Sequence, residues 1–542
     1  MKSYLNLIFN SHLPFVRHPE YENFLEEDWL YEAINESYIP LIRLLLKLHM
    51  EEVPFKLTFS FSPTLTSMLS DPLLKERFAA YMEKHIELGE KEVNRLQGKA
   101  EEKIARIYLQ ALNENYSFWK DECKTDLLEE FNKLNNDGCI EIITTAATHS
   151  YLPLYKNFEV ATNAQIETGV ISQIRTFDRY NGGFWLPENG FYPGLEEALK
   201  RHNVSWTSLA GQSLVLSEDK VLRGNYAPVK CPNGLYCFAR DYNLSSLVWA
   251  ADEGYPADPD YREFYRDIGY DLPLDYISPY IHEPNVRVFT GFKYWAITGK
   301  TTDKVIYSPE KASKKAKLHA SNFLYHVRRR TESVNGILDT DPCYTVSWDT
   351  ELFGHWWYEG IQWLENLIRE AATVTDIELI TSTGYLANTD KIQTLRPSFS
   401  SWGDGGFSQV WNDNSTNAWI IKHVYKSIEH MQELAVRFPK QSSLKNRFLT
   451  QAARETLLLM ASDWPFMIYN HSTEEYANKR IMGHIENLNL VYDNMSKNAV
   501  NTEWLVKAER RNNIFPFIDY NIFNPEHLKE PSLVYTSEYQ KI

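Results

Sequence analysis

The chain has 542 residues, more than one small domain needs, so a large core with additional domains is expected. Hydrophobic residues make up 43% and charged residues 24% of it, as in ordinary globular proteins, which excludes extensive disorder. The formal net charge of −16, with 56 Lys and Arg among 72 Asp and Glu, argues against a nucleic-acid binder and favours a neutral ligand.

The N-terminal sequence MKSYLNLIFNSHLPF predicts a first strand. It lacks the basic start, the sustained apolar stretch and the small-residue cleavage site of a signal peptide. The longest apolar runs, such as the one in IPLIRLLLKLHM, are broken by charge well short of the roughly 20 residues that span a bilayer. We therefore expect a cytoplasmic protein with no membrane partner.

Strand-like and helix-like runs alternate through the first two-thirds of the chain. After the first strand a helix is expected near Leu25 to His49, and then strands in FKLTFSFS, CIEIITTAAT, GGFWLP and CYTVSWD. This alternation predicts a parallel sheet wrapped by helices, either open or closed into a barrel. In such folds the site lies at the carboxyl ends of the strands, so polar residues that follow these strands should converge on one cleft.

Two regions show helical patterns instead. Residues 71–136 are charged, with apolar residues recurring at intervals of three and four, which predicts a helical insertion between the second and third strands. Its charges are typical of a solvated face. After about Phe407 the pattern is almost entirely helical, as in NAWIIKHVYKSIEHMQELAVRF, which predicts a C-terminal helical domain.

Aromatic residues are abundant, at 14% of the chain with 15 Trp and 33 Tyr. Aromatic rings combined with carboxylates and amides suit sugars, which have flat C–H faces and hydroxyl rims, although large cores also contain many aromatics. The five cysteines include no C-x-x-C pair, and their odd number points to a reducing compartment.

Two carboxylates follow predicted strands among aromatic residues. Glu188 lies in GGFWLPENGFYPG, where Trp185 and Phe191 are expected to line the cleft, and Asp349 lies in YTVSWDTELFGHWWYEG. Hydrolysis of an acetal requires such a pair, because one carboxylate attacks the sugar while the other protonates the leaving oxygen. The alternative is structural: Glu188 would cap a turn, and Asp349 or Glu351 would cap a helix starting near Leu352.

Two histidines also follow predicted strands. His12 ends the first strand and His149 a later one, so both imidazoles should reach the cleft and can form hydrogen bonds with sugar hydroxyls. The alternatives are a purely structural hydrogen bond or a metal site. A metal site calls for a tight Asp/His/His set, and no helix-spaced H-x-x-x-H pair is present, so no metal and no cofactor are expected.

Five motifs, NSHLPFVRHP, ATHSYLPL, GFWLPENGFYPG, WDTELFGHWWYEG and SWGDGGFSQVWND, followed by SDWPF, give the chain a resemblance to glycoside hydrolase family 57. Within that family the chain looks like the branching-enzyme and amylase-like group. The resemblance spans almost the whole chain and implies an α/β fold, a distorted (β/α)7 barrel of residues 1–70 and 137–400. It also implies a helical insertion at 71–136 and an all-helical C-terminal domain at 401–542.

The resemblance also implies residue roles. Glu188 matches the nucleophile and Asp349 the acid/base of a double displacement. The other matching residues are expected to bind the glucan: His12 and His149 near the reacting sugar, Trp402 and Trp411 as stacking aromatics, and Arg262, Gly291 and Asp463. Trp185, which is expected to line the cleft, is predicted to bind the glucan as well.

The function preferred on this basis is a 1,4-α-glucan branching enzyme with side hydrolysis, acting on amylose, glycogen and maltooligosaccharides. The alternatives are an α-amylase or 4-α-glucanotransferase, and, from another class, a non-catalytic glucan-binding protein. Three features depart from the branching-enzyme pattern: Ser472 replaces a Gln, the stretch Asp267 to Thr290 is longer, and the mobile-loop tyrosine could be Tyr226, Tyr236, Tyr242 or none of these. The sequence leaves the oligomeric state open.

Overall fold

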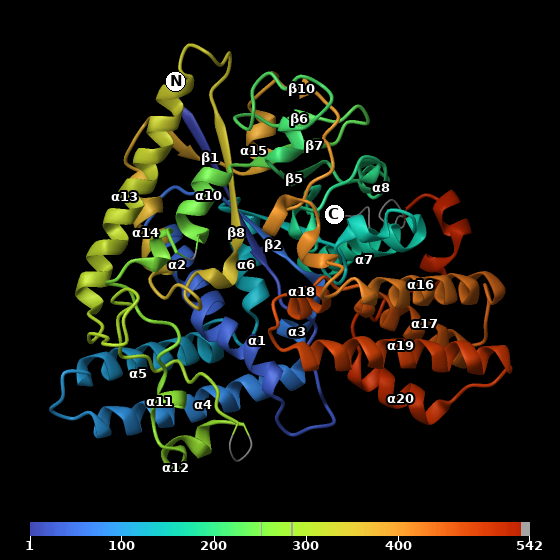
Figure 1. Cartoon of the computed structure of the whole chain (residues 1–542), viewed down its shortest axis with the longest axis horizontal. Coiled ribbons are helices and arrows are strands. Elements are labelled where there is room, and N and C mark those ends of the chain that lie inside the picture. Colours follow the sequence, from blue (N-terminus) through green and yellow to red (C-terminus); the bar gives the residue numbers. More distant parts are fainter. Residues whose placement is uncertain (251, 283–285, 533–542) are drawn as a thin grey trace.

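The computed structural model describes residues 1–250, 252–282 and 286–532. Its centre is a closed barrel of seven parallel strands surrounded by helices (Figure 1). The barrel order is β1, β2, β3, β4, β5, β7 and β8. These strands span Ser3–Ser11, Leu57–Phe61, Ile140–Thr145, Gly183–Trp185, Trp206–Ala210, Tyr236–Arg240 and Cys343–Asp349. The predicted (β/α)7 barrel is confirmed.

β1 is the longest barrel strand and fixes the register of its neighbours. Asn10 of β1 lies opposite Ser60 of β2 and opposite Asp349 of β8. The barrel closes where β7 meets β8, with Arg240 opposite Thr345. Three short strands extend the sheet outside the barrel: β9 beside β1, β6 antiparallel to β7, and β10 beside β6, with bounds Ile377–Leu379, Val229–Lys230 and Gln393–Thr394.

The five strands expected from apolar runs are present, but two barrel strands, β5 and β7, did not stand out in the sequence. All five residues of β5 are buried, including Thr207 and Ser208. A barrel strand is covered by helices on one face and by the barrel interior on the other, so it shows no alternation of polar and apolar residues. β5 is short and contains hydroxyl residues, so neither an alternation of polar and apolar residues nor a continuous apolar run identifies it.

Helices cover the outside of the barrel. The helix predicted near residues 25–49 is present and is interrupted by a π-helical turn at Ile34–Tyr38. In place of the helix expected near Leu352, a 3-10 turn follows β8, and the next α-helix, α14, begins at Gly360. The helices around the barrel are α1 Asp28–Ala33, α2 Ile39–Met50, α3 Pro63–Ser70, α6 Leu127–Asn136, α7 Glu159–Phe177, α8 Leu195–Arg201, α9 Gln212–Val215, α10 Tyr242–Trp249, α13 Pro309–Val334, α14 Gly360–Ala371 and α15 Ser382–Ala387.

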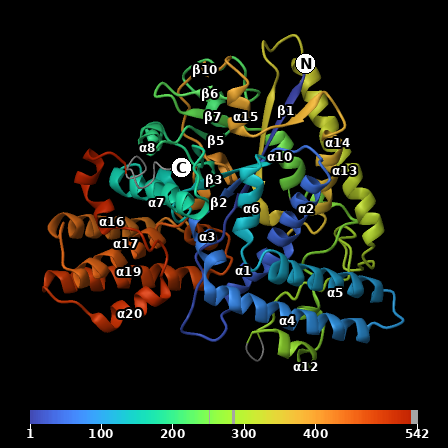
Figure 2. The ribbon, with the colours of Figure 1, turned by 180° about the vertical axis from the view of Figure 1, so that it is seen from behind.

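Two long helices, α4 (Pro72–Arg95) and α5 (Glu102–Ser117), pack side by side at one end of the molecule, as both ribbon views show (Figures 1 and 2). They lie within the predicted insertion. The segment containing α11 (Ile268–Asp271) and α12 (Leu274–Ile277) packs against them, since Tyr276 of α12 donates a hydrogen bond to Glu92 of α4 (2.8 Å). The predicted boundaries of the three domains stay predictions, and residues 251, 283–285 and 533–542 lie outside the described residues.

The C-terminal region is helical, as predicted. α17 is buried at its centre, and α16, α19 and α20 pack around it. None of the helices in the described parts of the chain is both long enough and apolar enough to cross a membrane. The helices of this region are α16 Trp419–Arg437, α17 Ser443–Leu459, α18 Asp463–Tyr469, α19 Glu474–Ser496 and α20 Thr502–Arg511.

Candidate functional site

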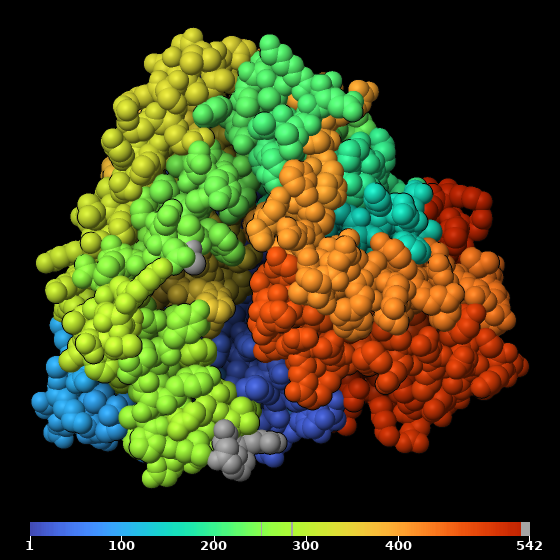
Figure 3. Space-filling model, in the orientation of Figure 1, coloured from blue at the N-terminus to red at the C-terminus, as the bar shows by residue number. Residues whose placement is uncertain are grey.

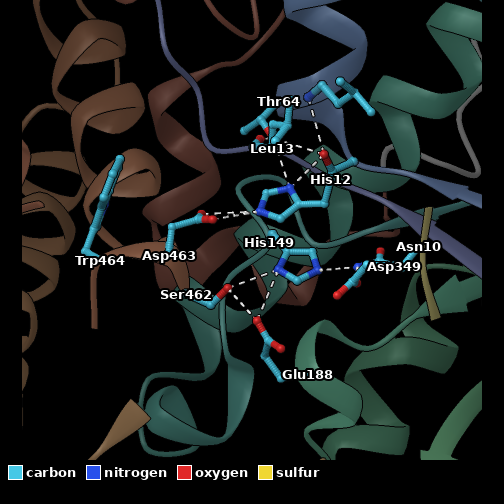
Figure 4. Close-up of polar contacts among 12 residues, drawn as sticks. Asn10, His12, Leu13, Thr64, His149, Glu188, Asp349, Ser462, Asp463 and Trp464 are labelled. Atoms are coloured by element: carbon cyan, nitrogen blue, oxygen red, sulfur yellow. Dashed lines mark hydrogen bonds and ion pairs between the residues drawn. The ribbon is translucent and has the colours of Figure 1, made fainter. Parts of the chain in front are cut away.

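The four polar residues predicted to meet at the strand ends do lie together (Figure 4). His12 follows β1, His149 follows β3, Glu188 follows β4, and Asp349 is the last residue of β8. The parallel direction of these strands brings their carboxyl ends to the same end of the barrel.

Hydrogen bonds hold both oxygens of the Glu188 carboxyl group. Trp402 Nε1–H donates to Oε2 (2.6 Å) and the Ser462 hydroxyl donates to Oε1 (3.1 Å). The backbone at Glu188 has φ 60° and ψ 20°, a left-handed conformation that non-glycine residues rarely adopt. Trp402 N–H donates to the Glu188 carbonyl (2.8 Å), which holds the turn in this shape. Strained backbone of this kind is concentrated at functional sites.

A continuous chain of hydrogen bonds joins the two carboxyl groups. Asn10 Nδ2 donates to Asp349 Oδ1 (3.0 Å) and to His149 Nε2 (3.4 Å). His149 Nδ1–H then donates to Ser462 Oγ (3.0 Å), whose hydroxyl donates to Glu188. Burial and the neighbouring His12 lower the pKa of His149 well below its ordinary value. The ring is therefore neutral, as its role as both acceptor and donor requires.

His12 lies directly beside His149. The two imidazole rings stack with centroids 3.9 Å apart. His12 Nδ1 accepts from Ser62 Oγ (2.9 Å), while Nε2–H donates to Asp463 Oδ1 (3.1 Å). Ser462 and Asp463 come from the start of α18, so the helical C-terminal region supplies two side chains to this cluster.

Burial perturbs the pKa values of both carboxyl groups. Burial and the negative charge of Asp349 raise the pKa of Glu188 to about 8. Burial also raises the pKa of Asp349, although the hydrogen bond from Asn10 and the proximity of His12 and Arg240 oppose the rise. Interacting carboxyls titrate as a pair. Both carboxyl groups therefore hold their protons to a higher pH than free carboxyl groups do.

A third carboxyl group, Glu351, lies beside the pair. It accepts hydrogen bonds from the Tyr38 hydroxyl and from the His12 backbone N–H (3.2 Å). Burial and the charge of Asp349 raise its pKa to about 8. The sequence alone predicts only a possible helix cap at Glu351. The sequence signal for a role of Glu351 in the site was its position two residues after Asp349, which ends a buried strand.

A basic residue, Arg240, is also part of the site and was missed. It ends β7, is 8% exposed, and its guanidinium lies 5.2 Å from the centre of the Trp402 ring. Burial lowers its pKa to about 10, whereas the charge of Asp349 raises it. Arg240 thus faces both the half-buried tryptophan and the carboxylate that the sequence did identify.

The three predicted tryptophans differ in exposure. Trp402 is half-buried beside Glu188, and Trp249 stacks near it with centroids 6.1 Å apart. Trp185 and Trp411 are fully buried, and Tyr151 stacks on Trp411 at 4.7 Å. Neither buried ring offers a free face to a sugar in this structure. The expectation that Trp185 and Phe191 line the cleft is corrected accordingly, since Phe191 is 0% exposed as well.

Arg262 and Gly291 lie in a separate cluster around Glu36. The Arg262 guanidinium is 4.0 Å from the centre of the Tyr358 ring. Burial lowers the pKa of Arg262, but Tyr108 and Glu36 outweigh burial and raise it. Gly291 has φ +79°, and a Cβ there would lie 3.2 Å from Glu36 Oε1. His355 Nδ1 donates to Glu36 Oε2 (2.6 Å). The glucan-binding roles of Arg262 and Gly291 stay predictions.

The residues that depart from the branching-enzyme pattern are spread over the molecule. Tyr226 packs on Tyr344 near the start of β8, and Tyr236 begins β7, so both lie near the amino ends of the barrel strands, away from the candidate site. Tyr242 follows the carboxyl end of β7 and is 72% exposed. Of the three candidate tyrosines, Tyr242 is the one at the end of the barrel where the candidate site lies. Ser472 is exposed, in the turn before α19.

Among residues 1–250, 252–282 and 286–532, no group of three or more His, Cys, Asp or Glu side chains is arranged to hold a metal ion. The cluster at the strand ends instead has the composition of an acid/base site: two close carboxyls, a third nearby, a neutral imidazole and a cation. This set can protonate a leaving group and attack an electrophilic carbon.

Comparison with known families identifies the larger group. A model of glycosyl hydrolase family 57 matches residues 6–395. The chain belongs to glycosyl hydrolase family 57. A second model, described as the C-terminal region of 1,4-alpha-glucan branching enzyme, matches residues 423–523, so the family 57 barrel is followed by a helical region of that type.

Individual relatives of this family 57 chain carry two kinds of name. This chain is 30% identical to a 1,4-alpha-glucan branching enzyme of Thermococcus kodakarensis, over 98% of this chain and 80% of that protein. Its structure is similar to that of the alpha-amylase AmyC from Thermotoga maritima, with 35% identity, a TM-score of 0.90 and coverage of 96% and 99% of the two chains. A family 57 branching enzyme from Pyrococcus horikoshii gives 30% identity, a TM-score of 0.87 and 98% coverage of both chains.

Proposed function

We propose that the chain is a retaining α-glucan-active enzyme, and specifically a 1,4-α-glucan branching enzyme with side hydrolysis. The observation that carries the proposal is the pair Glu188 and Asp349, joined through Asn10, His149 and Ser462 at the ends of barrel strands. The branching-enzyme names among its relatives and the match of its C-terminal region support the specific activity.

The proposed reaction is a double displacement. Glu188 attacks the anomeric carbon while Asp349 gives its proton to the glycosidic oxygen, so the C–O bond breaks and a glycosyl-enzyme ester forms. Asp349 then removes a proton from the acceptor hydroxyl, which attacks the anomeric carbon and releases Glu188. Two inversions leave the configuration unchanged. The reacting state needs the proton on Asp349, and the hydrogen bonds from Trp402 and Ser462 favour the ionised Glu188.

The acceptor decides the product. The 6-hydroxyl of another glucan gives a branch, water gives hydrolysis, and the 4-hydroxyl gives a linear transfer product. The similarity to the alpha-amylase AmyC makes hydrolysis the second candidate. A purely binding protein has no need of two facing carboxyls with raised pKa values, so the pair argues against a non-catalytic role.

Incubating the purified protein with amylose tests the proposal. We expect new α-1,6 linkages, measured by debranching or NMR, to exceed new reducing ends. Reducing ends without branches would assign a hydrolase, and neither product, with glucan still bound, would assign a binding protein. In a glucan-bound structure the two carboxyl groups should lie about 5–5.5 Å apart, and a much larger separation would contradict the retaining mechanism.

Two substitutions of Trp402 separate its hydrogen bond from its ring. Trp402→Phe removes the N–H that stabilises ionised Glu188, so the pKa of Glu188 rises further. The alkaline limb of the profile of kcat/KM against pH should then move up by about one unit, and the plateau should fall about tenfold. Trp402→Ala should in addition weaken glucan binding through lost stacking.

The comparison between the two Trp402 variants is the control. An unchanged alkaline limb in Trp402→Phe would show that Glu188 does not set that limb. Wild-type kinetics of Trp402→Ala on long glucans would refute a role for the ring in binding.

A further inference from the structure

An aromatic cluster lies on the surface beside the turn that follows β8. Trp356 of this turn is 55% exposed and stacks on Phe264, with centroids 4.5 Å apart and an interplanar angle of 26°. Tyr265 is 70% exposed and packs edge-on against Phe264 at 5.2 Å. Exposed large aromatics that stack on one another are unusual on a soluble protein and mark a binding surface.

Buried polar groups hold this cluster from below. Lys293 is 2% exposed, and its Nζ lies 4.3 Å from the centre of the Phe264 ring and 4.0 Å from that of Phe289. The same ammonium group pairs with Asp267 (3.6 Å). One face of Phe264 therefore contacts the cation and another contacts Trp356. The rings are fixed before any ligand arrives, which lowers the entropic cost of binding.

The cluster is attached to the candidate active site. Trp356 N–H donates to the Glu351 carbonyl (3.3 Å), and the neighbouring His355 is held by Glu36 (2.6 Å). His355 and Trp356 lie in the short connection between Asp349, the last residue of β8, and α14, which begins at Gly360. Figure 3 shows a hollow where gold atoms of the chain near residue 350 are flanked by yellow-green residues on one side and by the orange-red C-terminal region on the other.

We propose that Trp356 and Tyr265 form a platform that binds glucose units of an α-glucan chain away from the bond that reacts. The proposal rests on the proposed function. Sugar rings present flat C–H faces that stack on aromatic rings, and indole and phenol groups suit an amphipathic ligand. At the rim, Arg266 pairs with Asp271 (3.0 Å), and both side chains are partly exposed, so they can also form hydrogen bonds with hydroxyl groups.

Binding to amylose and to maltotriose, measured in the Glu188→Gln background so that no turnover occurs, tests the platform. Trp356→Ala should weaken amylose binding about fivefold and maltotriose binding less than twofold, because only a long chain reaches both sites. Trp356→Phe, which keeps a ring, should restore most of the affinity. Tyr325→Ala is the matched control, since this tyrosine is 53% exposed on α13 and lies outside the cluster.

Each outcome decides the proposal. Wild-type amylose affinity in both Trp356→Ala and Tyr265→Ala would overturn the platform while leaving the proposed function intact. If Trp356→Ala lowers the melting temperature, Tyr265→Ala carries the test alone. A wild-type dimer that Trp356→Ala converts to a monomer would make the cluster a subunit interface and overturn the proposal. Failure of the parent Glu188→Gln protein to bind amylose would remove the proposed function together with the platform.

Discussion

Replacing Glu188 with glutamine should lower kcat on amylose by about 10⁴-fold or more, because the amide cannot form the glycosyl-enzyme ester. Glucan affinity should change little, since the two side chains have nearly the same shape. Only one of the two donors, Trp402 Nε1–H and the Ser462 hydroxyl, keeps an oxygen acceptor in the variant. Branch formation and reducing ends measure the loss, and calorimetric titration with maltooligosaccharides measures binding.

The control for this substitution is Glu197→Gln on α8, an exposed glutamate close to Glu188 in the sequence. It should show wild-type kinetics. Substantial activity in a purified Glu188→Gln variant, verified by mass spectrometry to be free of deamidation, would reject Glu188 as the nucleophile.

Replacing Asp349 with alanine should have an effect that depends on the leaving group. On amylose kcat/KM should fall about 10³-fold, because the departing sugar oxygen needs a proton. From an aryl α-maltooligoside, an acidic phenol can leave without being protonated. The glycosyl-enzyme should therefore still form, and it should then accumulate because no base activates the acceptor. Added azide needs no base, so it should attack the glycosyl-enzyme and release the sugar as the α-glycosyl azide.

The anomeric configuration of the azide product distinguishes the two roles. An α-azide requires two displacements and hence an intact Glu188, whereas a β-azide would mean that azide replaced the nucleophile and that Asp349 has that role. Asp303→Ala, at an exposed aspartate, provides the control and should behave as wild type. Equal losses on amylose and on the aryl substrate would exclude Asp349 as the acid.

The sequence predicted the parallel sheet and four members of the site for one physical reason. Apolar runs identify strands, and in a parallel sheet the residue that follows each run must lie at the carboxyl end. His12, His149, Glu188 and Asp349 all follow such runs, so their meeting could be predicted without knowledge of tertiary contacts.

The remaining members depend on contacts that no local pattern records. Arg240 ends a strand that is buried on both faces and carries no alternating signal. Ser462 reaches Glu188 only because α18 docks against the barrel. The burial of Trp185 and Trp411 depends on their neighbours, among them Trp402 and Tyr151, so a tryptophan in a motif could not be assigned to the cleft or the core beforehand.

The start of α18 also constrains how this architecture can change through recombination. A barrel that exchanged its helical region for an unrelated one would lose the serine that contacts Glu188 and the aspartate that contacts His12 in a single event. Barrel and helical region therefore have to be inherited together, and one continuous buried core also joins them. Insertions in the α4–α5 lobe should be tolerated more readily, because the hydrogen bonds to the two carboxyl groups come from Asn10, Trp402 and Ser462, which lie outside this lobe.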